Sequence, residues 1–304
     1  MRMGVYAIES GCLSASAAID NANFARKQVH SNTRVSAIQF DKKLEVKQTL
    51  TGELLSGLPQ ALENGEFKLY LQPKFSPKDL SVIGAEALTR WIKPDGTVVY
   101  PDQFIPILES TGRIVDLDLY IFEQVARFLQ RNAQAGHRLL PIAVNASAVL
   151  AREDAPTQEY SEILEKHNIS ARMLEIELTE TAVVSEYDRV KRLLSSFQSD
   201  GMQTSLDDFG AGSSLLNNIV DIPVNTIKLD KLFLTRCSSN ARGTDFLREV
   251  VHLVKRLGYN VICEGIETEE QVQLLRSLDC DGAQGFWFSK AIPAEEFERR
   301  YLCS

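Results

Sequence analysis

Two aspartates stand side by side at Asp207 and Asp208, where the short apolar run TSL meets FGAG. Successive residues of a strand point to opposite faces, so both carboxylates reach one place only if the strand ends at this point. We predict that Asp207 faces one metal ion from the strand and that Asp208 reaches a second ion from the loop. The glycines of 209–212 then allow a connection to a helix that we expect to begin near Ser213.

Polar side chains recur at or near the carboxyl end of one predicted strand after another. A parallel strand that is buried on both faces should be almost entirely apolar, so this recurrence needs an explanation. If the strands close into a barrel, their carboxyl ends meet at one mouth, and the polar side chains lie there together. The set is Gln72, Glu86, Asn145, Glu177, Asp207, Lys228, Glu264 and Gln284.

The acids of this set favour metal ions. Carboxylates within about 4 Å of one another repel by a few kcal/mol at an effective dielectric near ~20, and Arg90 and Lys228 offset only part of that cost. The donors are oxygens without cysteine or histidine, which favours Mg²⁺ or Mn²⁺ over Zn²⁺. Two such ions about 3.5 to 4 Å apart can activate a water and stabilise an in-line displacement at phosphorus. Lys228 would orient that water and Glu264 would accept its proton, so the pattern predicts phosphodiester hydrolysis.

The elements that position these residues are short strands and amphipathic helices in alternation. Alternation of this kind predicts a parallel sheet with helices outside, and eight strands over about 250 residues favour a modified (β/α)8 TIM barrel, an α/β fold. Within 173–180, the period of two places Glu175, Glu177 and Thr179 on one face. The predicted strands are 67–72, 82–88, 141–146, 173–178, 204–208, 226–230, 260–264 and 282–286, and the predicted helices are 118–133, 186–201, 244–259 and 269–280.

The first 45 residues differ from the rest and predict a small α+β unit. GVYAIE and RVSAIQF have strand character, LSASAAIDNANFARKQVH has helical character, and DKKLEVKQ follows as a charged linker. The unit is too small to fold comfortably alone, so we expect it to dock on the barrel or to be a fragment of something larger. The predicted domains are therefore residues 1–45 and 46–304.

The composition of the chain argues against several classes of protein. The net charge of −8 argues against a surface for duplex nucleic acid. No apolar run approaches the roughly 18 residues of a membrane span and the amino terminus lacks a signal-peptide core, so we expect a cytoplasmic protein without membrane contact. Five cysteines without C-x-x-C spacing indicate reduced thiols rather than a disulfide framework or a zinc site.

Eight motifs in order resemble those of EAL-domain cyclic di-GMP phosphodiesterases, from about residue 55 to the end of the sequence. The motif EAL alone would be weak, but the ordered set is highly specific. The resemblance implies a modified (β/α)8 barrel that opens cyclic di-GMP to linear pGpG with two Mg²⁺ or Mn²⁺ ions, and it implies a homodimer. The motifs are QPK (72–74), EALTRW (86–91), VNAS (144–147), ELTE (177–180), DDFGAGSSL (207–215), IKLD (227–230), EGIE (264–267) and QGFWFSK (284–290).

By motif position, the resemblance also implies roles for individual residues. Asp207 would be shared between the two metals, and Asp208 would bind the second. Lys228 would contact the nucleophilic water, and Glu264 would act as the base or as a water-bridged ligand. The ligands of the first metal would be Glu86, Asn145, Glu177 and Asp207.

Residues around the metals have implied roles as well. Glu180 would anchor the DDFG loop, and Glu267 would support the side of the second metal. Gln72, Arg90 and Gln284 would contact the substrate or its surroundings.

The sequence departs from the family pattern at three positions. Ala211 and Ser213 stand where threonine and tyrosine are usual in DDFGTGYSSL, and Ala291 stands where a proline usually follows SK. These changes affect the stiffness of the loop and its coupling to dimerisation, and they leave the metal ligands untouched. The amino-terminal unit is similar to the last third of a GGDEF cyclase domain. Because the glycine-rich signature of that domain is missing, no cyclase activity is expected here.

Two other functions compete with the phosphodiesterase hypothesis. A non-catalytic receptor would bind the same dinucleotide, but it would be favoured by loss of Glu86, Asp207, Lys228 or Glu264, and none of these is lost. A different divalent-metal barrel enzyme for a small carboxylated substrate explains the acids but not the order of the motifs. Taken singly, Asn145 could cap a helix, Lys228 could be a solvated residue paired with Asp230, and Glu175 could be a surface acid.

Overall fold

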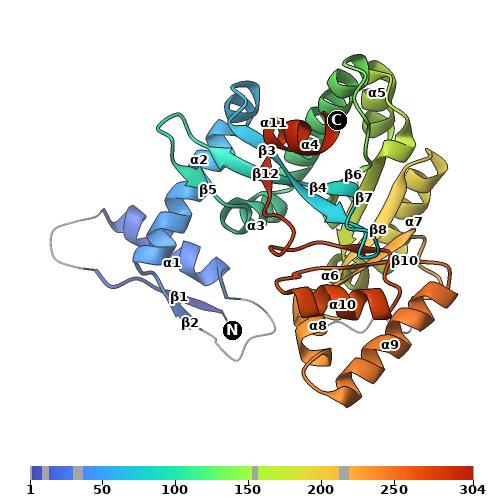
Figure 1. The fold of residues 1–304 in the computed structure, drawn as a ribbon. Helices are drawn as coiled ribbons and strands as arrows, with labels where there is room; N and C mark the ends of the chain where they lie inside the picture. Colours follow the sequence, from blue (N-terminus) through green and yellow to red (C-terminus); the bar gives the residue numbers. More distant parts are fainter. Residues whose placement is uncertain (1, 9–13, 30–36, 153–156, 212–218, 304) are drawn as a thin grey trace.

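A computed structural model describes residues 2–8, 14–29, 37–152, 157–211 and 219–303 of the chain. Among these residues, eight strands close into a barrel that helices surround (Figure 1), which confirms the predicted fold class. The order around the barrel is β3 (Phe67–Phe75), β11 (Gly282–Ala283), β10 (Asn260–Cys263), β9 (Thr226–Leu229), β8 (Gln203–Phe209), β7 (Leu174–Thr179), β6 (Ile142–Asn145) and β4 (Val82–Ile92), and β4 pairs with β3 again.

Strand β3 runs against its two barrel neighbours, so the prediction of a wholly parallel sheet is wrong at this strand. β3 pairs with β4 and with β11 in antiparallel fashion, whereas the remaining barrel pairs are parallel. Only the short segment 76–81 joins β3 to β4, and a parallel pair would need a crossover of about a dozen residues or more. In the resulting register Gln72 lies opposite Glu86, so both side chains belong to the same level of the barrel.

The surrounding helices are amphipathic, and they bury one face against the strands. In α9 (Ala241–Arg256) the buried residues are Leu247, Val250, Val251 and Val254, which recur at the three- and four-residue spacing of a helix face. Within the described part of the chain, no helix has both the length and the apolarity that crossing a bilayer requires. The other outer helices are α3 (Pro101–Thr111), α4 (Ile114–Gln134), α5 (Gln158–His167), α6 (Glu180–Ser185), α7 (Tyr187–Ser199), α8 (Lys231–Cys237), α10 (Glu269–Ser277) and α11 (Ala294–Phe297).

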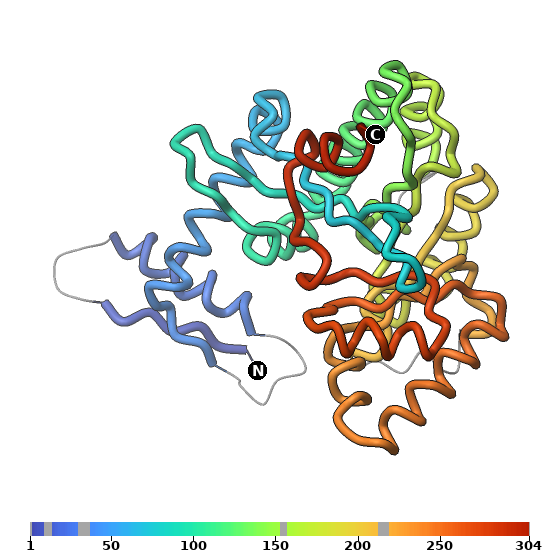
Figure 2. The backbone as a smooth tube through the Cα atoms, viewed as in Figure 1, coloured from blue at the N-terminus to red at the C-terminus, as the bar shows by residue number. Residues whose placement is uncertain are grey.

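The amino-terminal unit consists of a two-stranded parallel sheet, β1 (Met3–Val5) and β2 (Ala37–Gln39), and helix α1 (Ala15–Lys27). The stretch predicted as a charged linker is instead the start of a long helix, α2 (Lys42–Glu63), which carries the chain into the barrel (Figure 2). Asp41 begins this helix because its side chain accepts a hydrogen bond from the backbone N–H of Leu44 at 2.9 Å. The predicted boundary between residues 45 and 46 falls inside α2 and stays a prediction.

Candidate active site

The two adjacent aspartates reach the same side because the backbone turns at Asp208. Strand β8 continues through Phe209, so it does not end at Asp208 as predicted. Instead Asp208 has a φ of 57°, and the register between β8 and β9 shifts between Leu206 and Phe209. This irregularity interrupts the alternation of side chains, and aspartate tolerates the left-handed conformation better than most residues. The carboxylate oxygens of Asp207, Asp208 and Glu264 consequently lie within 4.8 Å of one another.

A second group of three carboxylates lies beside the first and shares one member with it. Oxygens of Glu86, Glu177 and Asp207 also lie within 4.8 Å of one another, and all three residues are buried. The side-chain amide of Asn145 donates to Oε1 of Glu86 at 3.1 Å. In the described residues, β4, β6, β7 and β8 thus bring their polar side chains to one end of the barrel, and Asp207 joins the two groups.

Lys228 lies at the centre of these acids. Its side chain is fully buried, and its Nζ lies 2.6 Å from Glu264 Oε1 and 2.8 Å from Glu177 Oε2. Oxygens of Glu86 and Asp207 each lie 3.2 Å from the same nitrogen. The alternative interpretation of Lys228 as a solvated partner of Asp230 is therefore wrong, and Asp230 instead caps α8 through the N–H of Leu232 at 2.8 Å.

The acids around Lys228 differ in their affinity for protons. Burial alone would raise the pKa of Glu177, but Lys228 and Lys74 together lower it to about 2. Burial raises the pKa of Asp207 to about 8 and that of Glu264 to about 7, and Lys228 counteracts only part of this effect. The pKa of Lys228 is itself well above its usual range, because the surrounding carboxylates outweigh the effect of burial. The site is thus short of positive charge, which a divalent cation would supply.

Two of the three predicted substrate residues lie at the acid cluster. The amide of Gln284 donates to Glu86 Oε2 at 2.7 Å and to Gln72 Oε1 at 3.2 Å. Gln72 donates in turn to the carbonyl of Ser289 at 3.1 Å. Arg90 lies farther along β4, where its guanidinium contacts the rings of Tyr70 and Tyr100, each with the centroid 5.5 Å away.

The two predicted loop residues make different contacts. Glu180 is buried, and its Oε2 accepts the backbone N–H of Gly210 at 2.9 Å, which ties the start of α6 to the end of β8. Glu267 accepts from Lys231 Nζ at 2.6 Å near the protein surface. Of the departures from the family pattern, Ala211 is exposed and Ala291 directly precedes β12 (Ile292–Pro293). Ser213 and the helix predicted to begin there lie outside the described residues.

A cavity of about 250 Å³ opens at this end of the barrel. Gln72, Glu86, Glu264 and Gln284 form its polar side, and Phe286 lies at its edge with 62% of its surface exposed. The preceding residue is Gly285, where an added Cβ would lie 2.2 Å from backbone atoms of Ile266, so a larger residue would push this segment away from the mouth.

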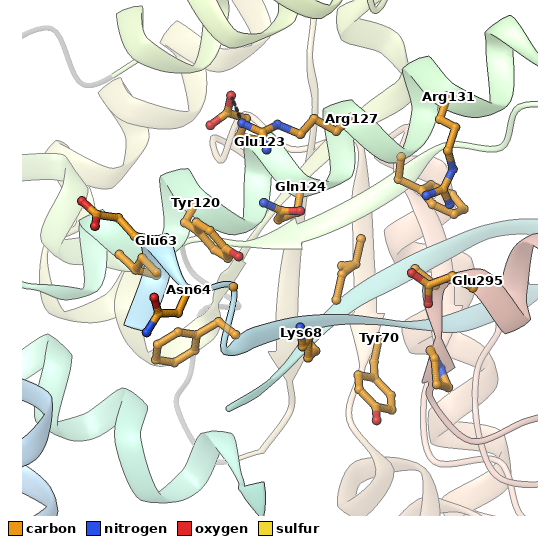
Figure 3. Close-up of a pocket in the computed structure, with 17 residues that line it drawn as sticks. Glu63, Asn64, Lys68, Tyr70, Tyr120, Glu123, Gln124, Arg127, Arg131 and Glu295 are labelled. Carbon is orange, nitrogen blue, oxygen red and sulfur yellow. Dashed lines mark hydrogen bonds and ion pairs between the residues drawn. The ribbon is translucent and has the colours of Figure 1, made fainter. Parts of the chain in front are cut away.

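A larger cleft lies elsewhere, on the outside of β3. It measures about 990 Å³, and its walls include Lys68 and Tyr70 of β3 and Tyr120, Arg127 and Arg131 of α4 (Figure 3). Its acids and bases are mixed, and none of the clustered carboxylates lines it. We therefore place the site at the smaller cavity, where the acids converge.

Comparison with known proteins identifies the family. The sequence model of the EAL domain matches residues 56–291. This chain belongs to the EAL-domain family. The chain is 34% identical over 281 residues to the signaling protein YkoW of Bacillus subtilis, covering 92% of the chain and 34% of YkoW. It is 32% identical over 286 residues to the cyclic di-GMP phosphodiesterase NbdA of Pseudomonas aeruginosa, covering 93% of the chain and 36% of NbdA.

A solved structure agrees with this assignment. The PaMucR phosphodiesterase in a c-di-GMP complex has a TM-score of 0.73 and 31% sequence identity, and the match covers 81% of this chain and 99% of that one. The predicted membership of the EAL-domain family is thereby confirmed. The chain spans about a third of the length of YkoW and of NbdA.

Sequence reasoning missed some residues of this EAL domain. Lys74 is buried inside the barrel, with Nζ 2.8 Å from Glu177 Oε1 and 3.1 Å from Glu175 Oε2. The interpretation of Glu175 as a surface acid is therefore wrong. Strand parity carried the available signal, because Glu175 shares a face with Glu177 and Lys74 shares one with Gln72. Phe286 had no comparable signal in the sequence.

Proposed function

We propose that this EAL domain is a phosphodiesterase that hydrolyses cyclic di-GMP to linear pGpG with the help of two Mg²⁺ or Mn²⁺ ions. One observation carries the proposal: two groups of three carboxylates share Asp207 at the mouth of the barrel. Their oxygen donors suit small hard cations. The raised pKa values of Asp207 and Glu264 agree with this assignment, since protons occupy carboxylates that a cation would neutralise.

The residues divide into two ligand sets under this proposal. Glu86, Asn145, Glu177 and Asp207 would hold one ion, and Asp207, Asp208 and Glu264 would hold the other, with Glu264 in direct or water-bridged contact. When bound, the ions would polarise the phosphodiester and make a water more acidic.

Lys228 and Glu264 would orient and deprotonate the attacking water. Glu264 Oε1 lies 2.6 Å from Lys228 Nζ, so a water that contacts both groups could be oriented by the ammonium and deprotonated by the carboxylate. A pKa near 7 suits a base that works close to neutral pH. The positive charge of Lys228 would then offset the negative charge that develops on the phosphoryl oxygens.

The surroundings of the acids fit a dinucleotide. Gln72 and Gln284 line the cavity beside the acids, where they would contact the substrate or its surroundings, and the exposed ring of Phe286 offers a face on which a base can stack. Arg90 would extend the contact surface beyond the mouth. Glu180 would keep the DDFG loop in place, and Glu267 would hold Lys231 beside the side of the second ion.

The remaining proposals rest on the sequence, and two of them, the GGDEF remnant and the homodimer, rest on its resemblance to known families. We propose that residues 1–45 are the remnant of a GGDEF domain, that the protein works in the cytoplasm, and that it forms a homodimer. Sedimentation equilibrium of the purified protein tests the dimer, and a monomer at micromolar concentration would refute it.

Incubation of the purified protein with cyclic di-GMP and Mn²⁺ tests the proposed reaction. Chromatography should show linear pGpG, and excess EDTA should abolish its formation. Glu86→Ala serves as the matched inactive control, because it removes a ligand while circular dichroism checks that the barrel is retained. Dinucleotide that is bound but stays intact would make the protein a receptor instead.

A further inference from the structure

Charges alternate down the interior of the barrel beneath the proposed metal site. Lys74, from the reversed strand β3, lies between Glu175 and Glu177, which are two positions apart on β7. Lys228, from β9, contacts Glu177 from the other side. Each oxygen of Glu177 therefore has its own ammonium partner, Lys74 at Oε1 and Lys228 at Oε2, both at 2.8 Å.

The stability of the fold does not by itself explain why Lys74 is buried inside the barrel. Its relative exposure is 3%, and burying an ion pair commonly costs as much as it returns, so a hydrophobic replacement of the whole pair is often neutral or stabilising. Oε1 of Glu175 is also buried and has no hydrogen-bond partner among the described atoms, which adds to the cost. A barrel interior selected for packing alone would be apolar at these positions.

Lys74 contacts Glu177 directly and so constrains the orientation of its carboxylate. The terminal torsion of a glutamate side chain has a broad, roughly two-fold profile, so the carboxylate plane needs an external partner to fix it. Lys74 holds Oε1, while Oε2 lies 2.8 Å from Lys228 Nζ, the ammonium that Glu86 and Asp207 also contact. Without Lys74, only Lys228 at Oε2 would hold the carboxylate of Glu177, and Glu175 would repel it.

We propose that Lys74 is a positioning residue that makes Glu177 present one oxygen, Oε2, to a divalent cation. The inference rests on the metal site of the proposed function. Groups that orient metal ligands through hydrogen bonds typically contribute about 10- to 100-fold in metal affinity. Lys74 need not touch the substrate or the ion to have this effect.

Three variants separate positioning from simple charge balance: Lys74→Met, Glu175→Gln, and the double variant with both changes. Glu175→Gln is the matched control, because it removes the other partner of Lys74 and leaves the contact to Glu177. The double variant has the same net charge in the barrel interior as the wild type. Isothermal titration of Mn²⁺ without dinucleotide measures metal affinity, and calorimetric melting in EDTA measures stability.

We expect Lys74→Met to bind Mn²⁺ about 10- to 100-fold more weakly than the wild type, and Glu175→Gln to stay within about threefold. The double variant should melt close to the wild type while its affinity for Mn²⁺ stays low. Should Lys74→Met fail to fold, the double variant decides the question. If the double variant binds Mn²⁺ with an affinity within about threefold of the wild type, the proposal is overturned. Lys74 would then serve only to neutralise the charge of Glu175.

The test of Lys74 and the test of the proposed phosphodiesterase activity can fail independently. A wild-type protein that binds Mn²⁺ but leaves cyclic di-GMP intact would refute the phosphodiesterase, and the role of Lys74 would still be decided by titration. Hydrolysis by the wild type together with normal Mn²⁺ binding by the double variant would refute the role of Lys74 alone.

Discussion

Replacement of Lys228 by methionine would remove a fully buried ammonium that lies 2.6 to 3.2 Å from four carboxylates. Methionine has nearly the same length, so the change acts mainly on charge. Removing one partner of a buried ion pair costs about 3 to 5 kcal/mol, because the other partner is left uncompensated. For a domain of roughly this size each kcal/mol lowers the melting temperature by about 2 to 4 °C, so we expect a decrease of about 6 to 20 °C in EDTA.

Divalent cations should reverse much of this loss, since they bring positive charge to the same oxygens. A ligand at 100 times its Kd stabilises the folded state by about 2.7 kcal/mol. The variant should therefore gain more from Mn²⁺ than the wild type, in which Lys228 already neutralises part of the site. Lowering the pH toward 5 should also help the variant, because protonation removes the repulsion among the acids.

Differential scanning calorimetry with EDTA and with Mn²⁺ measures both effects. Lys78→Met is the control, because the pair of Lys78 and Asp279 has side chains that are 63% and 60% exposed and an N···O distance of 2.7 Å. Such a surface pair contributes about 0 to 1 kcal/mol, and its loss should not depend on Mn²⁺. A melting temperature of Lys228→Met within about 3 °C of wild type in EDTA would refute the central placement of this charge.

Three further predictions concern the same site. Glu264→Gln should reduce turnover by about 10²- to 10⁴-fold while cyclic di-GMP binding stays within a few fold, because the amide cannot accept the proton of the water; near-normal turnover would show that Glu264 is not the base. Metal affinity should fall from pH 8 to pH 6, since Asp207 and Glu264 have pKa values of about 8 and 7 and must release protons to bind a cation, and calorimetry in two buffers of different ionisation enthalpy would count these protons. Phe286→Ala should raise KM for cyclic di-GMP about tenfold with kcat little changed, as expected for loss of about 1 to 3 kcal/mol of base stacking; an unchanged KM would exclude stacking on this ring.

Short apolar strands and amphipathic helices in alternation were sufficient to predict the barrel and its eight strands. These signals are local, because alternation along a strand depends on the chain direction alone. The recurrence of polar side chains at the carboxyl ends of the predicted strands placed Glu86, Glu177, Asp207 and Lys228 at one mouth, and the structure brings their side chains together. The functional roles of these residues stay predictions.

Other features depended on contacts between distant parts of the chain. The direction of β3 follows from the short connection to β4 and from closure of the barrel against β11, which no window of sequence displays. Asp208 takes a left-handed backbone within β8 rather than marking the end of the strand, because the pairing with β9 shifts there. Helix α2 replaces the expected linker, since Leu54 and Leu58 gain a buried environment only once the barrel is formed.

The sequence by itself thus determined which side chains can enter the barrel and what chemistry their oxygen atoms can perform. The tertiary structure decided how their charges pair, with Lys228 at the centre of the acids and Lys74 on the far side of Glu177. Pairing of this kind depends on distances of a few ångströms between strands that are far apart in the chain. Electrostatic energies in a buried site change steeply over such distances, and the order of residues along the chain does not specify them.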